Sequence, residues 1–232
     1  MGDTEAEKRQ AGVAAADEVR DGMALGLGSG STVFFFLEEL GRRVQHGLRV
    51  VGVPTSSSTA ELAGQFGIPL TTFDDRQELD LDVDGADEVD PDLNLIKGHG
   101  GALLREKIIA QAARRRLIIV DGTKMSPQLG NAVLPVEVVP FARTLAERGL
   151  HQLGGQPRLR MAADAKPFVT DNGNWIVDCR FGPIPDPAWL EAEINRVPGV
   201  MENGLFVSLA DEVVVAGESG VERLVRGVQT RA

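Results

Sequence analysis

The chain has 232 residues, of which 43% are hydrophobic and 25% are charged, a balance typical of a globular protein with a substantial core. The 24 basic and 34 acidic residues give a net charge of −10, which argues against a nucleic-acid partner because phosphates repel an acidic surface. No run approaches the roughly 18 uncharged apolar residues of a membrane-spanning helix, so no membrane partner is expected. The lone Cys179 and a first segment without an apolar stretch predict a reducing, cytoplasmic setting.

Alternating helices and strands are predicted over the first 125 residues. Residues 5–20 are rich in helix formers and precede a short apolar strand, MALGLG, after which VFFFLEELGRRV predicts the next helix. Further strands are expected in LRVVGVP, PLTTF, 79–84 and 116–120. The segments TSSSTAELAGQFG and 100–114 are each expected to open as a loop and continue as a helix. Strands that alternate with helices form parallel sheets with crossover helices, so this part predicts an α/β, Rossmann-like unit.

The pattern changes at about Leu134. A strand VEVVP, a helix FARTLAERGLHQLG and a strand PRLRMA are followed by two strand-like runs that flank an Asn172-Gly173 hairpin turn. The segment PDPAWLEAEINRVPGV predicts a helix, and LFVSLADEVVVAG with ESGVERLV predicts strand, strand, helix. We therefore expect a Rossmann-like domain over 1–131 and 206–232, with an inserted α+β lobe of ferredoxin-like type over 132–205.

The segment GLGSGST, residues 26–32, lies where a predicted strand passes into a helix. Glycine admits backbone angles closed to other residues, and the amides of a helix N-terminus attract anions. Ser29, Ser31 and Thr32 add hydroxyl groups. A P-loop would need a lysine, and a dinucleotide fingerprint would need glycine or alanine in place of Ser31. The pattern favours a phosphate site for a small ligand, with a tight structural turn as the alternative.

Acidic residues gather in DLDVDGADEVD, residues 80–90. Asp84 and Asp87 lie at the carboxyl end of a predicted strand, where open α/β sheets bind ligands. The run lacks the alternation of acids and glycine of a calcium loop, so no metal is expected there. The remaining acids are interpreted as a solvated turn: Asp80, Asp90 and Asp92.

The most specific segment is KGHGGALLREK, residues 97–107. Lys97 opens a loop in which three glycines surround His99, and Glu106 follows in the predicted helix. Glu106 has an alternative interpretation as a helix-surface acid paired with an arginine, and His99 has one as an exposed loop imidazole. The segment VDGTK again combines a strand end, a glycine and a lysine, Lys124.

Taken in order, these motifs resemble the ribose-5-phosphate isomerase family of type A. The resemblance runs nearly from end to end, through GLGSGST, TSSST, DVDGADE, KGHGGALLREK, VDGTK, LPVEVVPFA, VTDNGN and PGVMENGLF. One departure concerns loop geometry, because His99 interrupts what is usually a run of consecutive glycines after the lysine.

The resemblance implies a cofactor-independent, metal-free aldose-ketose isomerase that interconverts ribose 5-phosphate and ribulose 5-phosphate through an enediolate, in the non-oxidative pentose phosphate pathway. It implies that Glu106 is the proton-transfer base and that Lys97 faces the developing oxyanion. Asp84 would handle the hydroxyl and ring-oxygen protons, with Asp87 assisting. It also implies a homodimer or homotetramer through the inserted lobe. The expected substrate contacts are Ser29, Gly30, Ser31, Thr32, Gly85, Ala86, Gly98, His99, Gly100, Lys124 and Lys8.

Two alternatives come from other functional classes. Related Rossmann-like modules sense sugar phosphates in transcriptional regulators, but residues 1–20 predict one acidic helix rather than a DNA-reading helix-turn-helix. An amino-sugar-phosphate deaminase would need a catalytic histidine near its base, for which His99 is the candidate. Ammonia release measured beside ribulose formation separates the three interpretations.

Overall fold

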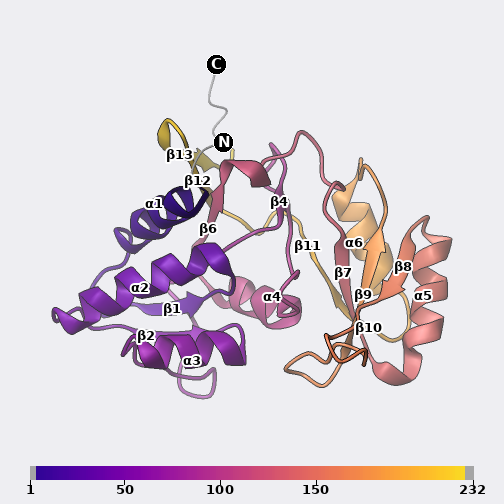
Figure 1. Ribbon diagram of the computed structural model, residues 1–232, viewed down its shortest axis with the longest axis horizontal. Coiled ribbons are helices and arrows are strands. Elements are labelled where there is room, and N and C mark those ends of the chain that lie inside the picture. Colours follow the sequence, from indigo (N-terminus) through magenta and orange to yellow (C-terminus); the bar gives the residue numbers. More distant parts are fainter. Residues whose placement is uncertain (1–3, 228–232) are drawn as a thin grey trace. The chain divides into compact units, whose positions relative to one another are not determined.

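A six-stranded sheet forms the centre of one of two units in the computed structural model, which describes residues 4–227 (Figure 1). This first unit comprises Met1–Ala86, Arg105–Met125 and Ser208–Ala232. The strand order is β13-β12-β6-β3-β1-β2, and all neighbours are parallel except β12 and β13. The strands are β1 (Ala24–Leu27), β2 (Val51–Pro54), β3 (Leu81–Asp84), β6 (Arg116–Asp121), β12 (Glu212–Gly217) and β13 (Gly220–Val225).

Helices pack against both faces of this sheet. The helical segments of the first unit are α1 (Thr4–Ala16), α2 (Ser31–Gln45), α3 (Ser57–Gln65), α4 (Leu103–Ala112) and the short 3₁₀ turn η1 (Gly122–Lys124). The first two residues of α4 belong to the second unit. Side chains alternate along a strand, so Leu25 and Leu27 of β1 join one core with α1 and α2, while Ala24 joins another with Ile109 of α4. At Gly26 a Cβ would lie 2.5 Å from Ile109 Cγ2, so glycine permits this close approach of the helix.

The second unit, Asp87–Leu104 and Ser126–Val207, contains a four-stranded antiparallel sheet of order β10-β7-β9-β8. Along the chain its elements run strand, helix, strand, strand, helix, strand, which confirms the expected ferredoxin-like arrangement. They are β7 (Leu134–Val138), α5 (Arg143–Gln152), β8 (Gln156–Leu159), β9 (Trp175–Arg180), α6 (Pro187–Asn195) and β10 (Val200–Asn203), with a 3₁₀ turn η2 (Pro140–Ala142) before α5. Leu150 and Ile194 of the helices pack on Val136 and Val177.

A small antiparallel sheet of order β11-β5-β4 completes the second unit. Its strands are β4 (Glu88–Val89), β5 (Leu95–Ile96) and β11 (Leu205–Phe206). The Glu88 carboxylate accepts hydrogen bonds from the amides of Gly130 (2.9 Å) and Ala132 (3.0 Å). These contacts place 87–104 and 126–131 with the inserted lobe, so the unit extends beyond the 132–205 expected from the sequence.

Three secondary-structure predictions are wrong. The strand-like run before Asn172-Gly173 contributes only two isolated bridges, from Met161 to Pro167 and from Val169 to Trp175. The run PLTTF contributes only an isolated bridge, from Leu70 to Gly52, and is not a strand. The segment ESGVERLV was expected to be helical and instead forms β13, which pairs with β12 through Gly217 and Gly220. The φ of +108° at Gly220 permits a two-residue hairpin loop, and pairing along β12 then overrides the helix propensity of the segment.

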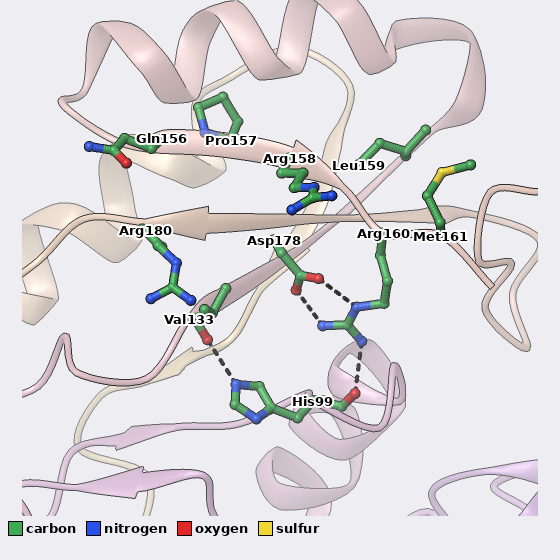
Figure 2. A pocket seen from close by; sticks show the side chains of 10 residues that line it. All are labelled: His99, Val133, Gln156, Pro157, Arg158, Leu159, Arg160, Met161, Asp178 and Arg180. Carbon is green, nitrogen blue, oxygen red and sulfur yellow. Dashed lines mark hydrogen bonds and ion pairs between the residues drawn. The ribbon is translucent and has the colours of Figure 1, made fainter. Parts of the chain in front are cut away.

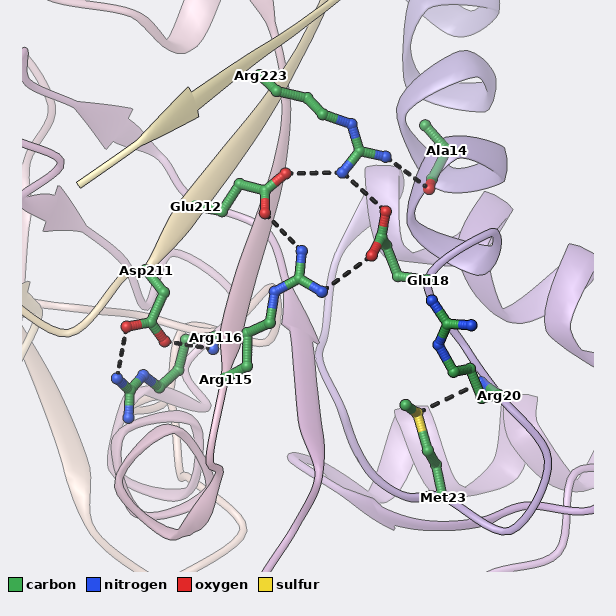
Figure 3. Close-up of polar contacts among 9 residues, drawn as sticks. All are labelled: Ala14, Glu18, Arg20, Met23, Arg115, Arg116, Asp211, Glu212 and Arg223. Carbon is green, nitrogen blue, oxygen red and sulfur yellow. Dashed lines mark hydrogen bonds and ion pairs between the residues drawn. The ribbon is translucent and has the colours of Figure 1, made fainter. Parts of the chain in front are cut away.

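Arg223 of β13 belongs to an ion-pair network in the first unit (Figure 3). It contacts Glu18 at 2.9 Å and Glu212 at 2.7 Å, and Arg115 contacts the same two carboxylates at 2.9 and 2.5 Å. Hydrogen bonding from Arg115, opposed by partial burial, holds the pKa of Glu18 below its usual range. The network therefore ties the segment after α1 to β6, β12 and β13.

Within residues 4–227, no helix has the length and apolar character needed to cross a membrane.

Candidate active site

The Asp84 carboxylate is held by backbone amides at the end of β3. The residue is 1% exposed, and its Oδ1 accepts hydrogen bonds from the N–H groups of Ser29 (3.1 Å) and Gly85 (2.7 Å). Because amides in a folded backbone cannot rotate away, this carboxylate has a fixed orientation. The structure thus connects GLGSGST with DGAD, which are 55 residues apart at this contact.

Gly28 is required where the loop passes Asp84. A Cβ on Gly28 would lie 2.2 Å from Asp84 Oδ1, 2.5 Å from its Cγ and 2.6 Å from its Cα, so no larger residue fits without moving Asp84. The glycine therefore allows the loop backbone to lie directly on the carboxylate.

The N-terminus of α2 has the properties of an anion site. Its N-cap is Gly30, with φ +116° and no capping side chain, and the helix begins at Ser31. A Cβ built on Gly30 meets nothing within 4 Å, whereas its positive φ favours glycine. Ser31 is exposed and Thr32 is buried. Amides in the first turn of a helix lack intrahelical acceptors, so this end can bind a phosphate through N–H groups.

The Ser29 hydroxyl belongs to a cluster of hydroxyl groups. Its Oγ lies 2.7 Å from Thr55 Oγ1, 2.8 Å from Ser56 Oγ and 2.8 Å from Thr59 Oγ1. Thr59 in turn donates to the carbonyl oxygen of Gly28 at 2.9 Å. Sequence reasoning did not identify this support, although the hydroxyl run TSSST was a visible signal. The cluster anchors the loop that contacts Asp84.

Glu106 lies in the first turn of α4 and is 4% exposed. The alternative interpretation, an acid on the helix surface, is therefore wrong. A carboxylate removed from water interacts strongly with the charges of a bound molecule, which suits a proton-transfer group. Its neighbour Lys107 is also 4% exposed.

Two further cations of the first unit were expected to meet phosphate. Lys124 ends η1, whose cap is the Asp121 carboxylate, an acceptor for the Thr123 amide at 3.0 Å. Lys8 lies on α1, and both lysines are half-buried. Over residues 4–227, no ion pair is formed by either ammonium group.

In the second unit, Lys97 follows β5 and is 3% exposed. Its amide donates to the carbonyl oxygen of Gly204 at 2.9 Å, and its Nζ lies 5.4 Å from the ring centroid of Phe206. The ring face attracts the ammonium, which stabilises a positive charge in a buried position. Lys97 thus presents a positioned cation.

The glycine loop after Lys97 is constrained by its neighbours. Gly98 has φ +100° and Gly101 has φ +81°, both favourable for glycine. A Cβ on Gly101 would lie 2.4 Å from Phe168 Cε1, whereas Gly100 faces open space. Arg160 donates to the carbonyl oxygen of His99 at 2.8 Å. Sequence reasoning did not identify Phe168 or Arg160, because no local motif marks a contact across 60 or more residues.

His99 is held through Asp87. The His99 amide donates to Asp87 Oδ2 at 3.0 Å, and its Nδ1 lies 3.3 Å from Asp87 Oδ1. The Nε2 donates to the carbonyl oxygen of Val133 at 3.0 Å, since a carbonyl only accepts. The side chain is 46% exposed, as the loop-imidazole interpretation expected, yet both ring nitrogens have partners. Asp87 therefore supports the loop in which His99 interrupts the run of glycines.

Within the described part of the chain, no three His, Cys, Asp or Glu side chains are grouped as a metal site. Gly85 and Ala86, the expected substrate contacts beside Asp84, are half-buried at the end of β3. The expected residues thus fall into one set in each unit: Lys8, Ser29, Gly30, Ser31, Thr32, Asp84, Gly85, Ala86, Glu106 and Lys124 in the first, and Asp87, Lys97, Gly98, His99 and Gly100 in the second.

Comparison with known proteins identifies the family. Residues 51–220 match the family described as ribose 5-phosphate isomerase A (phosphoriboisomerase A). The chain is 52% identical over 223 residues to ribose-5-phosphate isomerase A of Nitrobacter hamburgensis, covering 94% of this chain and 96% of that one. It is 53% identical over 219 residues to the protein of the same name in Gloeobacter violaceus, covering 94% and 95%.

Solved structures agree with these sequence relatives. A D-ribose-5-phosphate isomerase in complex with phospho-erythronic acid superposes with a TM-score of 0.95 at 41% identity, covering 97% of this chain and all of that one. The ribose 5-phosphate isomerase A of Methanocaldococcus jannaschii gives a TM-score of 0.92 at 41% identity, covering 96% and 99%. The regulator and deaminase alternatives are therefore set aside, and the chain belongs to the ribose-5-phosphate isomerase A family.

Proposed function

We propose that Glu106 moves the proton between C1 and C2 when this isomerase interconverts ribose 5-phosphate and ribulose 5-phosphate. The observation that carries the proposal is the burial of the Glu106 carboxylate at the start of α4, since a surface acid would be screened by water. As base, Glu106 removes the proton from C2 of the opened aldose, and the electron pair forms the enediolate. The ketose forms when that proton returns to C1 and the proton of the O2 hydroxyl group passes to O1.

Lys97 is proposed to stabilise the oxyanion of the enediolate. A positive charge held in a buried, preorganised position stabilises developing negative charge without reorganisation. The 3% exposure of Lys97 and its contact with Phe206 support this role. Asp84 is proposed to exchange protons with the ring oxygen and hydroxyl groups during ring opening, and its two amide donors support a fixed orientation. Asp87 is proposed to assist by holding the loop of His99, beside Gly98 and Gly100.

The phosphate is proposed to bind at the N-terminus of α2. Open space at Gly30 and the absence of a capping side chain support contacts from Gly30, Ser31 and Thr32. Lys124 and Lys8 add positive charge. The hydroxyl and amide of Ser29 already have partners, so we propose Ser29 chiefly as a positioning residue for Asp84. Gly85 and Ala86 remain proposed substrate contacts.

The complex of the relative with phospho-erythronic acid supports a sugar-phosphate ligand for this chain. That molecule carries a phosphate at one end and a carboxylate at the other. The oligomeric state, a homodimer or homotetramer, remains a prediction that light scattering tests. The cytoplasmic location also remains a prediction.

Lys97→Met tests the proposal against Lys107→Met, a control at a second buried lysine. Losing one electrostatic group of this type lowers kcat by about 10² to 10³, and we expect that loss for Lys97→Met alone. Thermal melting of both variants separates loss of the fold from loss of catalysis. Equal turnover in the two variants, measured as ribulose 5-phosphate formed per folded enzyme, would remove Lys97 from the mechanism.

A further inference from the structure

A pocket of 920 Å³ lies in the second unit, on the face of the four-stranded sheet opposite its helices (Figure 2). Its lining includes three arginines, Arg158 and Arg160 on or beside β8 and Arg180 on β9. Of the proposed catalytic and substrate-binding residues, only His99 contributes to the lining. The volume lies in the range of small-molecule sites, roughly 300 to 1,000 Å³.

One of the three arginines is fully engaged. Arg160 donates from Nε to Asp178 Oδ2 at 2.8 Å, pairs through Nη2 with Asp178 Oδ1, and donates to the carbonyl oxygen of His99 at 2.8 Å. Asp178 is the one acidic residue of the lining, so Arg160 neutralises it. Two positive charges are left, those of Arg158 and Arg180, in a chain whose net charge is −10.

Both remaining arginines are exposed, and within the described residues 4–227 neither side chain forms an ion pair or a hydrogen bond. The register of β8 and β9 sets their spacing, because Arg158 is opposite Asp178 and Gln156 is opposite Arg180. The two arginines are therefore diagonal neighbours on one face, with Cα atoms roughly 7 to 8 Å apart, within joint reach of their long side chains. One guanidinium group binds a phosphate through two parallel N–H···O hydrogen bonds. Two neighbouring arginines therefore suit a ligand with two linked phosphates.

We propose that this pocket binds a small organic diphosphate, with its phosphates on Arg158 and Arg180. The volume of the pocket exceeds what a diphosphate group alone occupies, which leaves room for an organic body. Arg160 joins the pocket to the backbone of the loop that follows Lys97. The binding claim is independent of the catalytic roles proposed above.

Calorimetric titration of the full chain with inorganic pyrophosphate tests the site. We expect binding by the wild type and at least about tenfold weaker binding by Arg158→Ala/Arg180→Ala, since charge-assisted hydrogen bonds are lost. The charge-matched control is Arg20→Ala/Arg148→Ala, which removes two exposed arginines outside the pocket and is expected to bind as the wild type does. Lys124→Ala, which alters the proposed sugar-phosphate site, is titrated beside them to show whether pyrophosphate binds there instead.

Three results would overturn the proposal. They are no binding by the wild type at millimolar pyrophosphate, equal weakening in the pocket and control double variants, or loss of binding in Lys124→Ala with retention in Arg158→Ala/Arg180→Ala. The last would assign the pyrophosphate to the proposed sugar-phosphate loop. Because both arginines are exposed, the double variant is expected to melt as the wild type does. Should it unfold, Arg158→Gln/Arg180→Gln provides the same test with longer polar side chains.

Discussion

Replacing Gly28 by alanine tests whether the position of the Asp84 carboxylate matters for catalysis. The new methyl group would lie 2.2 Å from Asp84 Oδ1, whereas ordinary contacts of a Cβ begin at 3.4 Å. The Asp84 oxygen or the loop must therefore move by about 1.2 Å, the difference between these distances. The Asp84 Cα is only 2.6 Å from the new atom, so rotation of the side chain alone does not relieve the clash.

The expected size of the effect follows from this displacement. Misplacing a catalytic group by about 1 Å costs about 10²-fold in rate, so kcat/KM for ribose 5-phosphate is expected to fall by about 100-fold or more. Overpacking also destabilises, by about 1 to 3 kcal/mol, which leaves most of the protein folded at 25 °C if its stability is ordinary. Activity is therefore expected to fall far more than the folded fraction.

Steady-state isomerisation and thermal melting are measured together on Gly28→Ala and on Gly64→Ala. Gly64 lies in α3, is exposed, and has nothing within 4 Å of a new Cβ, so its replacement is expected to stabilise by about 0.5 to 1 kcal/mol without loss of activity. In an Asp84→Ala background, Gly28→Ala is expected to have little further effect on turnover, because no carboxylate remains to be displaced. Wild-type kcat/KM in Gly28→Ala would refute the reasoning.

Three further predictions concern phosphate binding, the buried thiol and acid stability. Lys124→Ala is expected to lower kcat/KM for ribose 5-phosphate by about tenfold or more and to leave the weak turnover of ribose unchanged, and equal losses on both sugars would contradict a phosphate contact. Burial raises the pKa of Cys179 to about 12, so an aromatic disulfide reagent at pH 8 is expected to label it only after unfolding; stoichiometric labelling of the native protein would contradict this. Hydrogen bonding from Arg42, opposed by partial burial, lowers the pKa of Glu39 from 4.5 to about 2. Because the Arg42 side chain is 58% exposed and water screens such helix-surface pairs, Glu39→Gln is expected to cost about 0.5 to 1 kcal/mol of unfolding free energy at pH 7. Because the folded-state pKa is depressed, this difference from wild type is present above pH 4.5 and disappears as the pH falls towards 2; a difference independent of pH in denaturant titrations would show that Glu39 acts through packing.

The features predictable from the sequence are those with a local pattern. The strand-to-helix passage at GLGSGST and the strand end at Asp84 predicted the parallel sheet and its loops, because apolar runs and glycines mark them directly. The order of strands and helices likewise indicated the ferredoxin-like lobe. Burial of Glu106 was not predictable, since α4 has acidic, basic and apolar residues without a clear periodic face.

Features set by distant contacts were missed. β13 was predicted as a helix because Glu, Arg and Leu favour helices, whereas hydrogen bonding to β12 decides its state. Segment 87–104 was assigned to the first domain by its place in the chain, although β5 pairs with β11 more than 100 residues later. The hydroxyl cluster around Ser29 and the contact of Phe168 with Gly101 likewise join segments that no local pattern connects.

The central claim, that Glu106 transfers the proton between C1 and C2, is tested most directly by exchange with solvent. Wild-type enzyme is incubated with ribose 5-phosphate in deuterium oxide. Deuterium is expected at C1 of the ribulose 5-phosphate formed, because the protonated base exchanges its proton with solvent before returning it. Glu106→Gln keeps the size of the side chain and removes the base, so we expect kcat and deuterium incorporation to fall together by about 10² to 10⁴, with little change in substrate affinity. Glu106→Gln that retains more than half of the wild-type turnover would contradict the account.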